Sequence, residues 1–229
     1  MPEKFVIQGG RPLKGTVEIA GAKNAAFPIL AATLLTKETC LIDNIPLIED
    51  VFKMIDILKA LGAEVSWFGK KKIKVNCFNI DPKKTPADLV GHFRGSVLIS
   101  GPLLARFGKL KMPSPGGCLI GSRPIDTHLD AFFQLGFDIS LQNKIYNFKK
   151  SEKFKKTDEI VLREFSVTAT ENVLLFSAFN SDKKILKIAD VDYPVQELIK
   201  VLDKMGVKIK DKGCHTFEIT GRKNLKGFS

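Results

Sequence analysis

The sequence LGAEV at residues 61–65 is echoed by LGFDI at residues 135–139 and by MGVKI at residues 205–209. Each copy follows an apolar segment with helical spacing and precedes two alternating segments typical of a β-hairpin. The copies lie 74 and 70 residues apart, which is too long for a solenoid repeat and suits a unit of helix, strand, helix and hairpin. Three copies predict one α/β domain with pseudo-threefold symmetry. The predicted hairpins cover residues 63–75, 139–148 and 207–219.

Each unit opens with a helical segment of small and apolar residues, at 23–35, 94–106 and 168–179. Small side chains let helices pack closely, so we expect these three helices inside, with amphipathic helices and sheets around them. The predicted fold is an inside-out α/β barrel of three helix-strand-helix-hairpin repeats. Their predicted bounds are about 21–80, 90–150 and 160–222.

The three opening helices of such a barrel point their N-termini toward one rim. Lys23, Arg94 and residues 166–168 would therefore converge there. Helix N-termini attract anions, and a Lys and an Arg strengthen that attraction. A lysine at a helix start opposes the helix dipole, which favours a bound anion, although a Lys23 that merely points into water stays an alternative.

Length and composition indicate a folded globular protein. The chain has 229 residues, 44% of them hydrophobic, enough to fill a core. It contains no apolar run of about 18 residues, and its first residues lack a signal-peptide core. We expect a cytoplasmic protein.

The formal net charge of +11 permits an anionic ligand or a nucleic-acid surface. Lysines supply nearly all of the excess and are spread through turns such as 70–72, 83–84 and 155–156, without interleaved aromatic residues. This pattern favours a solvated lysine-rich surface, so we expect neither a nucleic-acid nor a membrane partner. The six arginines are stronger candidates for binding phosphate or carboxylate.

The four cysteines are Cys40, Cys77, Cys118 and Cys214, far apart and without a Cys-x-x-Cys pair. This spacing predicts separate thiols, no disulfide framework and no metal site. Cys40 lies in a strand-like run and is expected in the core. Cys118 follows Pro-Gly-Gly and precedes an Arg, an Asp and a His, which suits either a reactive thiol on a loop or a buried cysteine in a turn.

Three motifs resemble the enolpyruvyl transferase family: GAKNA at 21–25, Arg94, and PGGCLIGSRPIDTH at 115–128. The likeness covers essentially the whole chain and is to the branch that uses UDP-N-acetylglucosamine, because the shikimate-pathway branch lacks the Pro-Gly-Gly-Cys loop. It implies transfer of the enolpyruvyl group of phosphoenolpyruvate to the 3′-hydroxyl of UDP-N-acetylglucosamine, the first committed step of peptidoglycan synthesis. No metal or organic cofactor is implied.

The resemblance also assigns roles by position. Cys118 would protonate the methylene carbon of phosphoenolpyruvate and could form a covalent adduct, Lys23 and Arg123 would hold that substrate, and Arg94 would position both substrates. Asn24 would touch the sugar. The expected UDP site consists of Arg123, Pro124, Ile125, Asp126, Thr127, Ser166 and Val167. The sequence departs from the family's pattern at Gly91, Glu164 and residues 190–194, which bear on the affinity for UDP.

Members of this family have two similar domains with the active site between them. The resemblance implies that residues 21–229 form the cysteine-loop domain and that residues 1–20, with predicted strands at 5–7 and 15–19, belong to the second domain. That second domain, or another chain, would supply the Asp that deprotonates the sugar. We therefore expect the 229 residues to be inactive alone. The alternative is a noncatalytic anion- or nucleic-acid-binding protein on the same repeat fold.

Overall fold

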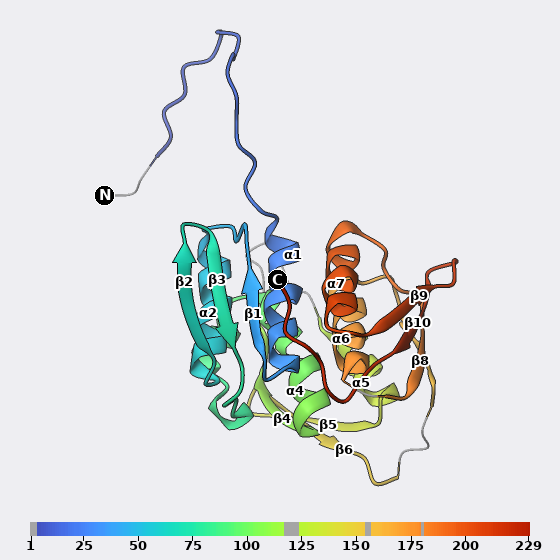
Figure 1. Ribbon diagram of the computed structural model, residues 1–229. Helices are drawn as coiled ribbons and strands as arrows, with labels where there is room; N and C mark the ends of the chain where they lie inside the picture. Colours follow the sequence, from blue (N-terminus) through green and yellow to red (C-terminus); the bar gives the residue numbers. More distant parts are fainter. Residues whose placement is uncertain (1–3, 117–123, 154–156, 180) are drawn as a thin grey trace.

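Three units of the predicted order surround one core (Figure 1). The structure, a computed structural model, describes residues 4–116, 124–153, 157–179 and 181–229. The first unit contains α1 (Lys23–Ala32), η1 (Thr33–Leu35), β1 (Thr39–Ile42), α2 (Glu49–Ala60), β2 (Glu64–Gly69) and β3 (Lys72–Asn76). The second follows η2 (Pro82–Lys84) and α3 (Ala87–His92), and contains η3 (Arg94–Ile99), α4 (Ser100–Phe107), β4 (Lys109–Pro113), α5 (Asp126–Gln134), β5 (Phe137–Gln142) and β6 (Ile145–Lys150). The third contains β7 (Glu159–Val161), α6 (Val167–Ala178), β8 (Lys183–Lys187), α7 (Tyr193–Lys204), β9 (Lys208–Asp211) and β10 (Thr216–Thr220).

Each unit builds its own sheet. The first two sheets have the orders β1-β3-β2 and β4-β6-β5 and are antiparallel. The third has the order β7-β8-β10-β9, in which β7 pairs with β8 in parallel. In all three sheets the second strand of the hairpin (β3, β6 or β10) pairs with the strand that precedes the outer helix (β1, β4 or β8), so the same connection is used three times. The three predicted hairpins are confirmed.

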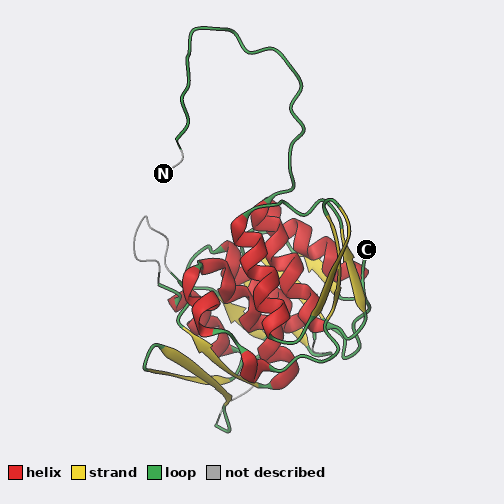
Figure 2. Ribbon diagram, turned by 90° about the vertical axis from the view of Figure 1, so that its left-hand side faces the viewer, coloured by secondary structure: helices red, strands yellow, loops and turns green. Residues whose placement is uncertain are grey.

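The helices lie at the centre and the sheets around them, as Figure 2 shows. Nine of the twelve residues of α6 are buried, which is expected for a helix packed on every side. Small residues permit this packing: a Cβ at Gly101 of α4 would lie 2.6 Å from the carbonyl oxygen of Asn172 in α6. The inside-out arrangement predicted from the small residues is confirmed. None of the helices within the described ranges has the length and hydropathy to span a bilayer.

Each of the three similar sequences contains a glycine at the same position, and the backbone conformation there requires one. Gly62, Gly136 and Gly206 follow the ends of α2, α5 and α7 and have positive φ values of 107°, 96° and 98°. Residues with a Cβ rarely adopt this conformation. A Cβ at Gly62 would also lie 2.4 Å from the carbonyl oxygen of Asn79. The glycine thus lets the chain turn from each outer helix directly into its hairpin.

The predicted strands at residues 5–7 and 15–19 are wrong. Residues 4–20 contain no helix or strand and run away from the body of the molecule (Figure 1). A strand needs a neighbour that pairs with its N–H and C=O groups, and no described strand lies beside this segment. Its large apolar side chains, Phe5, Val6, Ile7, Leu13, Val17 and Ile19, are exposed.

The predicted helix at 94–106 is only partly correct. Residues Arg94–Ile99 form a 3₁₀ helix, and the α-helix begins at Ser100. Pro102 lies in the first turn of α4, where its missing N–H leaves no helical hydrogen bond unmade. The α-helix can therefore begin at Ser100 but is disfavoured before it.

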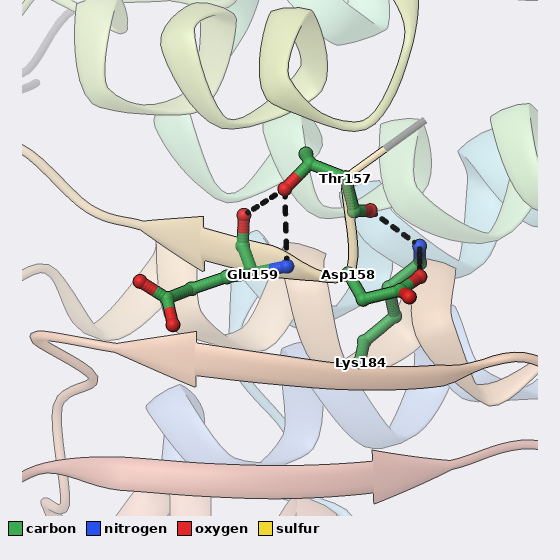
Figure 3. Close-up of polar contacts among 4 residues, drawn as sticks. All are labelled: Thr157, Asp158, Glu159 and Lys184. Atoms are coloured by element: carbon green, nitrogen blue, oxygen red, sulfur yellow. Dashed lines mark hydrogen bonds and ion pairs between the residues drawn. The ribbon is translucent and has the colours of Figure 1, made fainter. Parts of the chain in front are cut away.

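The edge strand β7 pairs with β8, and a buried lysine of β8 binds the residues just before it. Lys184 of β8 is only 6% exposed, and its Nζ donates to the Thr157 carbonyl at 2.6 Å and to Asp158 Oδ1 at 3.0 Å (Figure 3). The Thr157 hydroxyl donates to the Glu159 carbonyl and accepts from the Glu159 N–H. These bonds fix the residues before β7 against β8, so the third sheet gains a strand that the other two lack.

Candidate functional site

A cleft of about 550 Å³ lies where the N-terminal ends of α1, η3 and α6 meet. All three units contribute to it, because the opening helical segment of each unit begins at this rim. Five of the predicted site residues line it: Lys23, Asn24, Arg94, Ser166 and Val167. The other lining residues are Phe27, Asp50, His92, Phe93, Gly95, Leu98, Thr168, Glu171, Asp192 and Pro194.

The cleft holds two cations and the start of an uncapped helix. Lys23 Nζ lies 3.1 Å from Asp50 Oδ2, and both side chains are substantially exposed. Arg94 Nη2 donates to the Pro124 carbonyl at 2.8 Å. The N-cap residue of α1, Ala22, has no side chain that could accept from the first N–H groups of the helix. An anion placed here would meet a lysine, a guanidinium and helix N–H groups together.

Glu171 is a buried carboxyl group on the cleft wall. Its residue is 1% exposed, and Oε1 has no hydrogen-bond partner among the described residues. Burial, with the nearby charge of Asp190, raises the pKa of Glu171 to about 9. The group is therefore a neutral acid at pH 7, with a proton available to donate.

A buried network orders the wall beside Glu171. Asn172 Nδ2 lies 3.1 Å from the Val97 carbonyl and 3.0 Å from His128 Nδ1, and His128 Nε2 lies 3.1 Å from Thr168 Oγ1. The amide must donate both of its hydrogens, so Nδ1 accepts and Nε2 carries the proton and donates to Thr168. Burial, followed by the charge of Arg94, lowers the pKa of His128 to about 3. The imidazole is thus neutral, and the Thr168 hydroxyl keeps its own hydrogen to offer to the cleft.

The predicted UDP residues at the start of α5 lie beside this cleft rather than in its lining. Ile125 is buried, and Pro124 accepts the bond from Arg94. Asp126 lines a neighbouring hollow with Asp130 and Arg163. The Thr127 hydroxyl donates to Glu164 Oε1 at 2.8 Å, so an acidic side chain occupies the position between α5 and α6.

Two predicted residues, Cys118 and Arg123, lie outside the described residues. The residues on either side are placed: the Gly116 N–H donates to the carbonyl of Val90 in α3, and the Pro124 carbonyl accepts from Arg94. Both flanks of segment 117–123 therefore lie beside segments that line the cleft.

The three other cysteines differ in reactivity. Cys40 and Cys77 are buried, and burial raises the pKa of Cys40 to about 12 and that of Cys77 to about 11. Such thiols stay protonated and unreactive at neutral pH. Cys214 is exposed in the turn between β9 and β10.

Sequence reasoning placed Thr168 at the rim but missed Glu171 and Asp50 as cleft residues. A signal existed for Glu171, since it is the only charged residue in the otherwise apolar and small-residue segment 168–179. Asp50 carried no such signal, because an acidic residue in the first turn of an amphipathic helix is ordinary helix chemistry.

The fold is that of the enolpyruvyl transferases. The enolpyruvyl transferase NikO from Streptomyces tendae superposes with a TM-score of 0.81 at 23% identity, covering 96% of this chain and 52% of that one. EPSP synthase from Acinetobacter baumannii superposes with a TM-score of 0.72 at 14% identity, covering 93% of this chain and 48% of that one. The sequence profile of EPSP synthase (3-phosphoshikimate 1-carboxyvinyltransferase) matches residues 7–229, and the chain belongs to this family.

Relatives at higher identity carry a more particular name. UDP-N-acetylglucosamine 1-carboxyvinyltransferase from Coxiella burnetii is 40% identical over 227 residues, 99% of this chain and 52% of its own length. The enzyme of the same name from Treponema denticola is 40% identical over 224 residues, 98% of this chain and 52% of its own length. The chain thus spans about half the length of these relatives.

Proposed function

We propose that this chain is the substrate-holding part of a UDP-N-acetylglucosamine 1-carboxyvinyltransferase. The reaction would move the enolpyruvyl group of phosphoenolpyruvate onto the 3′-hydroxyl of UDP-N-acetylglucosamine and release phosphate, as a cytoplasmic step of peptidoglycan synthesis. The observation that carries this proposal is the cleft, in which Lys23 and Arg94 lie beside the uncapped start of α1. The relatives that are 40% identical support the choice of substrates.

Charge compensation is the first task of such a site, because both substrates are anions. In the proposal Lys23 and Arg123 hold phosphoenolpyruvate, Arg94 positions both substrates, and Asn24 contacts the sugar. Lys and Arg supply this compensation without changing protonation state. The UDP group would lie along Arg123, Pro124, Ile125, Asp126, Thr127, Ser166 and Val167.

Proton transfer is the second task. Cys118 would donate a proton to the methylene carbon of phosphoenolpyruvate while the sugar oxygen bonds to the adjacent carbon. The same methylene position then loses a proton as the C–O bond to phosphate breaks, which restores the enolpyruvyl double bond. A thiol suits this role because its ordinary pKa, about 8.5, is close to neutral pH.

Deprotonation of the sugar hydroxyl would come from a group outside these 229 residues. The relatives are about twice as long as this chain, which leaves room for a second domain with that group. The exposed apolar side chains of residues 4–20 are consistent with a segment that packs against such a domain. We propose that the cleft is completed by that domain or by a second chain.

Mass spectrometry of the cysteines tests the cleft assignment. A Cys214→Ser variant removes the exposed thiol, so labelling of the remaining cysteines can be compared. After incubation with phosphoenolpyruvate and UDP-N-acetylglucosamine, or with an epoxide, we expect modification at Cys118 and none at Cys40 or Cys77, whose pKa values are raised by burial. Equal labelling of Cys118, Cys40 and Cys77 would contradict a special role for Cys118.

Phosphate release tests the need for a second part. We expect no steady release from the 229-residue chain with both substrates. Release should begin when the unmatched half of the Coxiella burnetii relative is added, and it should fail with Cys118→Ala. Steady turnover by the chain alone would show that no second part is needed.

A further inference from the structure

Glu171 has three properties that are not found together in an ordinary core residue. It is 1% exposed, its Oε1 has no hydrogen-bond partner within the described part of the chain, and it lines the cleft that contains Lys23 and Arg94. A buried polar atom left unpaired costs about 1–3 kcal/mol. No hydrogen bond from a described residue to Oε1 offsets this free energy.

Neighbouring residues do not offer a structural role for the carboxyl group. The side chains next to it on α6 are used elsewhere: Thr170 Oγ1 accepts from the Asp190 N–H, and Asn172 bonds to Val97, Gly101 and His128. The nearby Asp190 is an acceptor when charged and repels a second negative charge. Glu171 lines the cleft, so it lies beside any anion that binds there.

We propose that Glu171 is a substrate-binding residue whose neutral carboxyl group donates a hydrogen bond to an oxygen of a phosphate or carboxylate bound between Lys23 and Arg94. The identity of that anion rests on the proposed function. The role of Glu171 as a donor rests on its burial, its unpaired oxygen and its place in the cleft wall. Glu171 would thus supply a short-range contact, while Lys23 and Arg94 supply long-range attraction.

The titratable groups that face Glu171 include both cations and anions, and the His128 imidazole among them is neutral. They are Lys23 from α1, Asp50 from α2, His92 from α3, Arg94 from η3, His128 from α5, and Asp190 and Asp192 from the segment before α7. The residue that α7 places in the cleft wall, Pro194, is uncharged. Lys23 and Arg94 attract an anion in the cleft, whereas burial and Asp190 keep the proton on Glu171.

The donor role makes anion binding sensitive to alkaline pH. When the proton leaves, Glu171 becomes an anion beside the bound anion, and the contact turns from attractive to repulsive. A glutamine at this position keeps a donor N–H and does not titrate. A leucine of similar size removes the donor altogether.

Isothermal titration calorimetry tests the proposal, with inorganic phosphate, phosphoenolpyruvate and UDP-N-acetylglucosamine as separate probes. At pH 7 we expect Glu171→Leu to bind at least one probe about tenfold more weakly than wild type, and Glu171→Gln to bind it nearly as well. Between pH 7 and pH 9.5 the affinity of wild type should fall about fourfold relative to Glu171→Gln. Ser177→Ala is the matched control, because Ser177 is also buried on α6 without a partner for its hydroxyl among the described residues, but it does not line the cleft.

The outcomes separate this proposal from the proposed function. Binding of phosphate that depends on Glu171, without binding of either organic substrate, would support the donor role and contradict the transferase assignment. Binding of the organic substrates that is equal in wild type and Glu171→Leu would overturn the donor role alone. A loss in Ser177→Ala as large as in Glu171→Leu would also overturn it, because general loosening of α6 would then explain the effect. Failure of wild type to bind any of the three anions would overturn both.

Discussion

Glu171 of α6 and Lys184 of β8 are two buried ionisable side chains that lie near opposite ends of α6. They differ in whether their polar atoms have hydrogen-bond partners. Lys184 lies beside Phe176 and Phe179 at the C-terminal end, where its ammonium group donates to Thr157 and Asp158. Glu171 lies near the N-terminal end, and its Oε1 has no partner among the placed residues.

The difference separates structure from function. A buried charge whose hydrogen bonds are all made within the protein stabilises the fold and has no donor left for a ligand. A buried acid with an unmade bond destabilises the fold and keeps its proton for a ligand. Substitution therefore removes a paired charge at Lys184 and an unpaired acid at Glu171.

The largest expected effect is the pH dependence of stability due to Glu171. Its pKa is raised from an ordinary value near 4.3 to about 9. Between these values the folded chain binds one proton more than the unfolded chain, so the free energy of unfolding falls as pH rises. From pH 6.5 to pH 8.5, urea unfolding should show wild type losing about 2.5 kcal/mol relative to Glu171→Gln. Parallel pH profiles of the two proteins would mean that Glu171 is already ionised.

Lys184 gives the next largest effect. Lys184→Ala removes two bonds from a buried ammonium group and should lower the free energy of unfolding by about 2 kcal/mol in urea. Phosphate binding at the cleft should not change. The matched control is Lys187→Ala on the same strand, whose ion pair with Glu159 is half exposed, so a loss below about 1 kcal/mol is expected. Equal losses would remove the distinction between a buried and a surface lysine.

His128 gives a smaller effect with the opposite sign. Its pKa is lowered from an ordinary value near 6.5 to about 3, so the unfolded chain binds the extra proton and stability falls as pH falls through this window. In a Glu171→Gln background we expect a loss of about 1 kcal/mol between pH 6 and pH 5 that is absent when His128→Gln is added. An unchanged slope would indicate that the imidazole is protonated in the folded chain.

The smallest effect concerns the exposed ion pair in the cleft. Asp50→Asn releases Lys23 from its carboxylate partner, so phosphate should bind about two- to fivefold more tightly by calorimetry. Asp56→Asn is the control, because Asp56 pairs with Lys59 on the same helix and does not line the cleft. A gain in both variants would reflect net charge alone.

The repeated architecture could be predicted from the sequence because each echo encodes a local requirement. A glycine with positive φ must stand where an outer helix turns into its hairpin, and small residues must stand where inner helices touch. The convergence of Lys23, Arg94 and residues 166–168 followed from that symmetry, and the structure brings them together in one cleft.

Features that depend on a distant partner could not be predicted. The alternation at residues 5–7 and 15–19 has the period of a strand, but period alone does not supply a neighbour to pair with. The short strand β7 was missed for the converse reason: its three residues carry almost no pattern, and they are ordered by Lys184 on another strand. The role of Glu171 was missed because it depends on the lack of a hydrogen-bond partner among the described residues, which the sequence does not show.

The meeting of three helix ends at one rim also affects how the chain folds. Each repeat supplies one wall of the cleft, so no single repeat can hold an anion, and a chain with one repeat unfolded has no binding site. A ligand that binds only the complete rim stabilises all three repeats at once by mass action. An anion bound at the rim would therefore make the three repeats unfold together. Binding of an anion would also show that all three repeats are folded.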